Sequence, residues 1–354
     1  MTDKVLVPAL DLRTDALTRP TPAMWKAMQT HEPDWATFGE DSAVRAVERA
    51  GAEILGKDAA LFVPTGALGN LLALLTHTRT GDWLIADPTT HVIRSEHRAF
   101  EAVAALRWLS IVGERGHISE DQVTEGILTL REQGVRQGLV WTENTHNWAG
   151  GTVQTVEQAT AVARTAHELG FRVHVDGARL FNAGAALGVP ASALVSEADS
   201  VMVNLNKGLG APYGALLSGT SDFVEIARDR LHQLGAGSTH QIGILASAAF
   251  VALATMQERM SLDNHTARYL GELLEDISGL ELMVGRVESN VVLVRAADGR
   301  SARSVVEALR LRGIGAFAAR DDVVRFVTHH HVEKRHADRV AREVARVVGG
   351  RGHY

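Results

Sequence analysis

Short apolar runs alternate with stretches of helical length along most of the chain, and this alternation is the strongest constraint on its fold. Six runs have the length and composition of buried strands: ALFVP (60–64), DWLIA (82–86), LRWLSIV (106–112), GLVWTEN (138–144), FRVHVD (171–176) and SVMVNL (200–205). Helical periods lie between them, for example at 120–133 and 156–170. The alternation favours right-handed crossovers. It therefore predicts an α/β fold with a mainly parallel sheet and helices on both faces.

The pattern changes near residue 240. The expected elements beyond it are a long helical stretch (241–276), short strands (289–296 and 323–329) and two further helices (301–313 and 331–348). Because 354 residues exceed the usual size of a single core, we expect more than one domain. The expected division is an N-terminal arm (1–20), a large α/β domain (21–245) and a small C-terminal α+β domain (246–354). The arm has no clear period and is expected to wrap onto another element or subunit.

The composition excludes several classes of partner. The net charge is −6 and no block of like charges occurs, so neither a nucleic acid nor an anionic membrane is expected as principal partner. The absence of cysteine excludes a disulfide framework and a thiolate nucleophile. No apolar run reaches membrane-spanning length, and the first residues lack the apolar core of a secretory signal. These features predict a cytoplasmic enzyme.

One of the five lysines, Lys207, has the surroundings of a Schiff-base residue. It follows an apolar strand and opens the glycine-rich turn GLGAPYG (208–214). The carboxyl ends of strands face the ligand crevice in open α/β sheets, and partial desolvation favours the neutral, nucleophilic amine. By contrast, the position of Lys57 between Gly56 and Asp58 is typical of a solvated surface turn. An isolated loop lysine is usually solvated as well, so the assignment of Lys207 depends on its neighbours.

Three further features lie in the order that a cofactor site requires. Asp176 ends its strand, where a carboxylate can pair with a protonated pyridine nitrogen, although a helix N-cap is equally expected there. Thr65 and Gly66 begin a helix, a position that favours phosphate but that capping also explains. His91 follows a strand, and its imidazole can stack on a ring or move protons. A lone histidine is nevertheless more often an ordinary turn residue.

Arginines and a histidine run complete the set of candidates. Arg179 and Arg325 can form bidentate contacts with a substrate carboxylate, although each in isolation is more often part of a surface ion pair. The run His329-His330-His331 suggests a metal site. Adjacent side chains of a strand point to opposite faces, however, so no metal site is predicted.

Seven motifs resemble those of the L-threonine aldolases: DLRTDALTRPTPAMWKAM (11–28), FGED (38–41), ALFVPTGALGNLLALL (60–75), ENTHNWAGG (143–151), VHVDGARLFNA (173–183), NKGLGAPYG (206–214) and VVRFVTH (323–329). The resemblance covers nearly the whole chain in order. It implies the PLP-dependent transferase-like fold (fold type I, the aspartate aminotransferase type) with a large sheet of the seven-stranded type. It also implies pyridoxal 5′-phosphate (PLP) as cofactor, and a homodimer or homotetramer with shared active sites.

The resemblance implies roles for individual residues. For the cofactor, Lys207 would carry PLP as a Schiff base, Asp176 would pair with the pyridine nitrogen, and His91 would stack on the ring. Further cofactor contacts would come from Thr65, Gly66, Ala67, Arg179 and His240. The substrate would be held by Thr14, Phe38, Arg179 and Arg325, of which Thr14 stands in place of the family's usual serine.

Several residues depart from the family pattern. Phe38 lacks the hydroxyl of the usual tyrosine, and Ala67 and Asn206 replace a threonine and a serine. His240 and Gln233 stand where arginine and lysine are typical, which lowers the positive charge near a neighbouring subunit's phosphate. The family's second active-site histidine is not found upstream of ENTH. These departures leave the cofactor prediction intact and bear on the choice of substrate and reaction.

The activity implied by the resemblance is cleavage or formation of the Cα–Cβ bond of L-β-hydroxy-α-amino acids such as L-threonine and L-allo-threonine. Glycine and an aldehyde would be the products, and His91 or a water that it orients would act as the base. Transaldolation, β-elimination and transamination are alternatives on the same scaffold. A catalytically inactive binding subunit is a different class, against which the intact Lys207 and Asp176 argue. A Rossmann dehydrogenase is set aside because G-x-G-x-x-G is lacking after the first strand.

Overall fold

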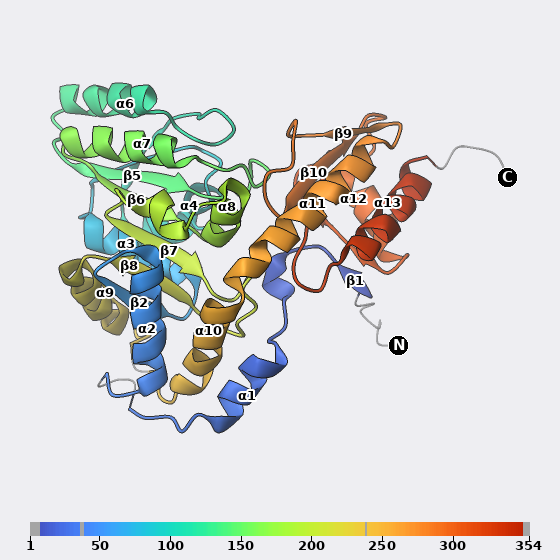
Figure 1. The fold of residues 1–354 in the computed structure, drawn as a ribbon. Coiled ribbons are helices and arrows are strands. Elements are labelled where there is room, and N and C mark those ends of the chain that lie inside the picture. Colours follow the sequence, from blue (N-terminus) through green and yellow to red (C-terminus); the bar gives the residue numbers. More distant parts are fainter. Residues whose placement is uncertain (1–7, 36–38, 238, 350–354) are drawn as a thin grey trace.

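A computed structural model describes residues 8–35, 39–237 and 239–349. A large sheet and a small sheet lie at opposite ends of the molecule, and helices α10 (Gly243–Thr255) and α11 (Met260–Glu275) connect them (Figure 1). Within the described ranges no helix is long and apolar enough to cross a membrane.

The large sheet has seven strands in the order β2-β8-β7-β6-β5-β3-β4. They are β2 (Ala59–Val63), β3 (Trp83–Ala86), β4 (Arg107–Ser110), β5 (Gly138–Glu143), β6 (Arg172–Asp176), β7 (Ser200–Asn204) and β8 (Ala215–Gly219). Strand β8 runs antiparallel to both of its neighbours, and the other pairs are parallel. The six predicted strands and the α/β fold class are confirmed. The expectation that 106–112 is buried is wrong, because β4 pairs only with β3 at the edge of the sheet and is largely exposed.

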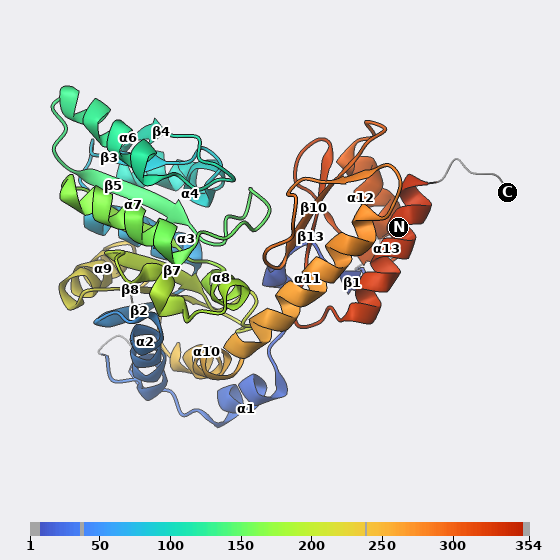
Figure 2. The same cartoon turned by 45° about the horizontal axis from the view of Figure 1, so that its top comes forward.

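Helices cover both faces of this sheet. In β2, Leu61 and Val63 pack with α3 (Gly66–His77) and α9 (Ser221–Gln233), whereas Ala60 and Phe62 face the opposite core. That opposite core is formed with α2 (Ser42–Leu55), α6 (Glu120–Glu132), α7 (Val156–Glu168), α8 (Leu180–Leu187) and α10. The period of two in β2 therefore divides its side chains between two apolar layers. Figure 2 shows α6 and α7 side by side along one face of the sheet.

The small sheet is antiparallel, in the order β12-β13-β10-β9. It comprises β9 (Leu280–Leu282), β10 (Val291–Ala296), β12 (Phe317–Ala318) and β13 (Val323–Val327), and α12 (Ala302–Arg310) and α13 (Lys334–Val348) pack with it. The stretch 241–276, predicted as one helical segment, is interrupted by a 3₁₀ turn at Gln257–Arg259. Ala252 of α10 packs in the large core, and so does Met260 at the start of α11. Leu270, further along α11, packs in the small core, so α11 passes from one core to the other.

The described residues of the N-terminal arm, 8–20, lie against the small core of their own chain. Strand β1 (Leu10–Asp11) pairs in parallel with β11 (Ile314–Gly315), and a 3₁₀ turn (Asp15–Leu17) and α1 (Pro22–Thr30) follow (Figure 1). Leu10 and Leu12 are buried in the small core. The histidine run contacts the arm's backbone: the Nε2 atoms of His329 and His330 lie 2.8 Å and 3.2 Å from the carbonyl oxygens of Asp11 and Arg19, and His331 Nε2 accepts from the Arg19 N–H at 3.1 Å. These three side chains therefore bind the backbone of the arm to the segment that follows β13.

One serine hydroxyl joins two histidines inside the large domain. His77 Nε2 lies 2.6 Å from Ser200 Oγ, and His174 Nδ1 lies 2.7 Å from the same oxygen. Burial lowers the pKa of His77 to about 4 and lowers the pKa of His174 well below its ordinary value. Both imidazoles are therefore neutral in the folded protein at neutral pH.

Acid is expected to destabilise the protein through these histidines. In the unfolded chain they take up protons near pH 6.5, whereas their folded pKa values are lower. Their contribution to stability is therefore complete above pH 6.5 and is lost as the pH falls toward 4. The free energy of unfolding should fall by up to about 1.4 kcal/mol per pH unit for each histidine. Urea unfolding at pH 7.5, 6.5, 5.5 and 4.5 measures this slope. His77→Gln should flatten it, whereas the exposed control His265→Gln should not; equal slopes would contradict the assignment.

Candidate active site

A cavity of about 170 Å³ lies where the arm, the large sheet and the small sheet meet. It is lined by Thr14 of the arm, by His91, Glu143, Asn147, Trp148, Asp176, Ala178, Arg179 and Lys207 of the large domain, and by Phe317 and Arg325 of the small sheet. Glu143 and Asp176 end adjacent parallel strands, and Lys207 follows the next strand along. Carboxyl ends of parallel strands lie at one edge of a sheet, which explains why these residues meet.

Lys207 follows β7 and opens a tight loop. Gly210 of this loop has φ +76°, a left-handed conformation that favours glycine. The carbonyl oxygen of Lys207 accepts from Thr18 Oγ1 at 2.7 Å, so the arm holds the loop in place. Burial lowers the pKa of the Lys207 amine, and Arg179 lowers it further against the opposing effect of Asp15 and other carboxylates. The neutral, nucleophilic form of the amine is thereby favoured.

Asp176 is buried at the end of β6 with its carboxylate fixed on both oxygens. Its Oδ1 accepts from the N–H of Ala178 at 3.1 Å, and its Oδ2 accepts from Asn70 Nδ2 at 2.9 Å. The helix N-cap expected as the alternative for this residue is wrong, because the N-cap of α8 is Arg179 and Asp176 accepts from the turn before that helix. The Asp176 side chain also lines the cavity. Asn70, on α3, is completely buried.

His91 begins the short helix α4 (His91–Arg94) and is held by a second carboxylate. Its backbone N–H donates to Glu143 Oε2 at 2.6 Å, and Glu143 Oε1 accepts from the N–H of Asn147 at 2.8 Å. Its imidazole lines the cavity, and its Nε2 lies 3.4 Å from Glu96 Oε1. Burial lowers the pKa of His91, although the carboxylates of Asp176 and Glu143 oppose this effect. A mainly neutral imidazole can accept a proton.

The two predicted arginines have different surroundings. Arg179 is buried and donates through Nε and Nη2 to Asp15 at 2.7 Å and 2.8 Å, and through Nη1 to Asn147 Oδ1 at 3.0 Å. Arg325 Nη1 donates to the same Asn147 oxygen at 3.2 Å, while its Nε is buried without a hydrogen-bond partner among the described residues. Burial, with Arg179 nearby, lowers the pKa of Arg325 to about 10. Arg325 is therefore the arginine with hydrogen-bonding capacity left for a carboxylate.

The remaining predicted residues lie outside the cavity lining. Thr65 and Gly66 are at the start of α3, where Thr65 Oγ1 accepts from the N–H of Leu68 at 3.1 Å, and Ala67 is exposed beside them. A Cβ added to Gly66 would lie 2.6 Å from Asn204 Oδ1, so a larger residue there would require the Asn204 side chain to move. His240 is exposed in the turn before α10. Phe38 lies outside the described residues.

Sequence reasoning gave no role to several residues that the structure places at or beside the cavity: Asp15, Asn70, Glu96, Glu143, Asn147, Trp148 and Phe317. Glu143, Asn147 and Trp148 belong to the motif ENTHNWAGG, and Asp15 belongs to DLRTD, so the motifs themselves were the available signal. The guanidinium carbon of Arg325 lies 4.8 Å from the ring centre of Phe317 and 5.7 Å from that of Trp148. These rings form an aromatic wall beside the arginine.

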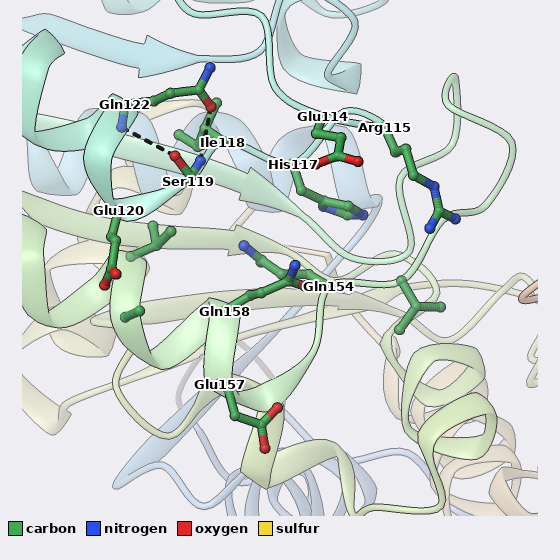
Figure 3. Close-up of a pocket in the computed structure, with 13 residues that line it drawn as sticks. Glu114, Arg115, His117, Ile118, Ser119, Glu120, Gln122, Gln154, Glu157 and Gln158 are labelled. Atoms are coloured by element: carbon green, nitrogen blue, oxygen red, sulfur yellow. Dashed lines mark hydrogen bonds between the residues drawn. The ribbon is translucent and has the colours of Figure 1, made fainter.

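A larger hollow, of about 630 Å³, lies elsewhere on the large domain (Figure 3). It is bordered by the starts of α6 and α7. At the start of α6, Ser119 and Gln122 exchange capping hydrogen bonds. The polar residues that line the hollow include His117 and Gln154, which Figure 3 labels. None of the residues predicted for the active site lines this hollow, so its size does not make it the reaction site.

The residues of the smaller cavity fit PLP. An amine of lowered pKa, a buried carboxylate and a mainly neutral imidazole border one space, as the aldehyde, ring nitrogen and ring face of the cofactor require. Arg325 borders the same space, and its buried Nε has no hydrogen-bond partner among the described residues.

Comparison with solved structures identifies the fold. Threonine aldolase of Leishmania major superposes with a TM-score of 0.82 at 20% identity, covering 96% of this chain and 99% of the other. SPT with its PLP internal aldimine superposes with a TM-score of 0.76 at 17% identity, covering 96% and 87%. The fold is thus that of the PLP-dependent fold type I enzymes.

Sequence comparison then gives the family. The model of the beta-eliminating lyase family matches residues 11–297, and the chain belongs to that family. It is 35% identical over 330 residues to low-specificity L-threonine aldolase 1 of Arabidopsis thaliana, covering 92% of each chain.

Proposed function

We propose that this protein is a PLP-dependent carbon–carbon lyase that converts L-β-hydroxy-α-amino acids, such as L-threonine and L-allo-threonine, to glycine and an aldehyde, or catalyses the reverse reaction. One observation carries the proposal: Lys207, Asp176, His91 and Arg325 border a single cavity. The chain that brings them together is 35% identical to a protein named as an L-threonine aldolase.

The proposed roles follow from the surroundings of each residue. Lys207 would hold the cofactor and Asp176 would pair with its ring nitrogen. Bound PLP supplies an electron-withdrawing ring that accepts the electrons of the breaking Cα–Cβ bond. Arg325, which borders the cavity, would bind the substrate carboxylate, and Thr14 lies in the same wall. Arg179, already bound to Asp15, would orient Asn147 and add positive charge. His91 would take the β-hydroxyl proton of the substrate.

A substrate panel tests the proposal. Purified protein loaded with PLP should release acetaldehyde and glycine in equal amounts from L-threonine or L-allo-threonine, and nothing from D-threonine. Aldehyde is measured by a coupled alcohol dehydrogenase, and glycine by amino-acid analysis. Ammonia or a keto acid without glycine would instead identify β-elimination or transamination. Failure to retain PLP on dialysis together with no product would favour the inactive subunit.

We further propose a cytoplasmic homodimer or homotetramer. Each chain would be divided into an arm (1–20), a large domain and a small domain, with the domain boundary after α10 and not at 245/246 as the sequence suggested, because Ala252 of α10 packs in the large core. Large apolar side chains exposed on the chain support assembly, among them Trp25 (53% exposed) on α1 and Phe250 (38%) on α10. In such an assembly His240, which is exposed and outside the cavity of its own chain, would contribute to a partner's site. Sedimentation equilibrium measures the assembly state.

A further inference from the structure

Glu96 connects the imidazole in the cavity to a buried amide behind it. Its Oε1 lies 3.4 Å from His91 Nε2, and its Oε2 accepts from Asn70 Nδ2 at 3.2 Å. The same Nδ2 donates to Asp176 Oδ2 at 2.9 Å. The side chain of Glu96 is 11% exposed and does not line the cavity. A carboxylate outside the cavity therefore contacts the proposed base within it.

The amide of Asn70 fixes which way Glu96 can bond. Because its two neighbours are carboxyl groups, Asn70 donates to both. Glu96 Oε2 must then accept, which leaves Oε1 to face His91. An ionised carboxylate only accepts hydrogen bonds, so His91 must carry its proton on Nε2. The other ring nitrogen, Nδ1, is then the acceptor. The separation of 3.4 Å is long for this bond, but catalytic pairs often tighten when substrate binds.

We propose that Glu96 is a positioning residue that sets the tautomer of His91, with the proton on Nε2, so that Nδ1 accepts the β-hydroxyl proton of the substrate. This role rests on the proposed aldolase function. As the substrate O–H bond breaks, an Nδ1–H bond forms and the electron pair left on oxygen becomes the second bond of the aldehyde C=O group. The Cα–Cβ bond breaks at the same time, and its electron pair leaves on Cα. The imidazolium is balanced by the Glu96 carboxylate and later returns its proton to product or water.

The surrounding charges determine the pH at which Glu96 can act. Burial, together with the nearby carboxylates of Asp176 and Glu143, raises the pKa of Glu96 to about 7 against the opposing effects of Asn70 and Lys207. His91 also faces Arg179, which with burial and Lys207 disfavours its charged form. Because the proposed role needs the carboxylate, kcat should rise with pH through about 7. The proton-accepting state is lost below that value as Glu96 is protonated.

Glu96→Gln tests the role, because glutamine reverses the hydrogen bond. Its amide oxygen must accept from Asn70, so its NH₂ group faces His91 Nε2 and drives the imidazole proton to Nδ1. We expect kcat to fall by about 10²- to 10⁴-fold, with the visible absorption of the bound cofactor retained. The step in kcat near pH 7 should vanish. Glu101→Gln is the matched control, since Glu101 pairs with His97 at 3.2 Å on the same segment but is 62% exposed. It should leave rate and pH profile unchanged.

A direct readout of the tautomer keeps this test independent of the rate. The measurement is a ¹⁵N spectrum of PLP-loaded protein labelled at its histidines. The signals of His91 are assigned by their loss in His91→Asn. At pH 8 the wild type should show a proton on Nε2 of His91. Glu96→Gln should move it to Nδ1, and Glu96→Asp, which keeps an acceptor, should retain the wild-type tautomer and part of the rate.

Two results would overturn the proposal: a wild-type proton on Nδ1, or a Glu96→Gln protein with the wild-type tautomer and a kcat within about twofold of wild type. The wild-type spectrum decides the question even if a variant does not fold. If the wild type cleaves no β-hydroxy amino acid, the proposed function fails, and the tautomer assigned to the Glu96–His91 pair is still decided by the spectra.

Discussion

Lys207→Ala is expected to abolish the visible absorption band of the bound cofactor and to lower kcat for threonine cleavage by on the order of 10³-fold or more, which corresponds to at least about 4 kcal/mol of transition-state stabilisation. The reason is that Lys207 is the described lysine whose amine borders the cavity, with Asp176 and His91 around it. Burial and Arg179 lower the pKa of its amine, which favours covalent bonding to an aldehyde. Absorption spectra of PLP-loaded protein and the coupled aldehyde assay measure the two effects.

Lys26→Ala provides the control for lysine removal. Lys26 is exposed on α1, so its removal should change neither the band nor the rate. The folded state of Lys207→Ala is checked by its far-ultraviolet circular dichroism and its unfolding midpoint. A band that persists in folded Lys207→Ala would place the cofactor on another lysine and would refute the assignment of the site.

The sequence predicted the large domain well because strand and crossover patterns are local. Each of the six apolar runs contains a strand. Asp176 ends one of these strands, His91 and Lys207 follow two others, and all three residues line the cavity. Strand β8 was missed because it is antiparallel to its neighbours and follows the loop of Lys207 without an intervening helix. The alternation rule contains no signal for such a strand.

Contacts between distant segments could not be predicted in the same way. Asp15 and Arg179 are 164 residues apart, Asn70 and Asp176 are 106 apart, and Asn147 and Arg325 are 178 apart. No periodic pattern encodes such pairs, because they depend on how the completed layers pack. Lys57 gives a similar lesson, since its ammonium donates to the carbonyl oxygens of Val195 and Ala198 at 2.6 Å each and is not freely solvated as its turn suggested.

Asp15→Ala is expected to destabilise the protein by about 3–5 kcal/mol, because it leaves the buried guanidinium of Arg179 without its carboxylate. Asp15 is fully buried, and burial alone would raise its pKa, but Arg179, Lys207 and Asn290 together outweigh burial and hold the pKa of Asp15 well below its usual range. Asp15 also accepts from Asn290 Nδ2 at 3.1 Å, which ties the arm to the small domain. Urea unfolding of the variant and the wild type at pH 7.5 measures the difference.

The matched control is Asp11→Ala on the same arm. Asp11 binds Arg13, whose side chain is 46% exposed, and an ion pair open to solvent contributes about 0–1 kcal/mol. The double variant Asp15→Ala/Arg179→Ala separates the cost of an unpaired charge from lost packing. It should be less destabilised than the sum of the two single variants, because removing the second partner also removes the uncompensated charge. Additive losses, or an Asp15→Ala protein as stable as Asp11→Ala, would show that the buried pair does not hold the arm over the cavity.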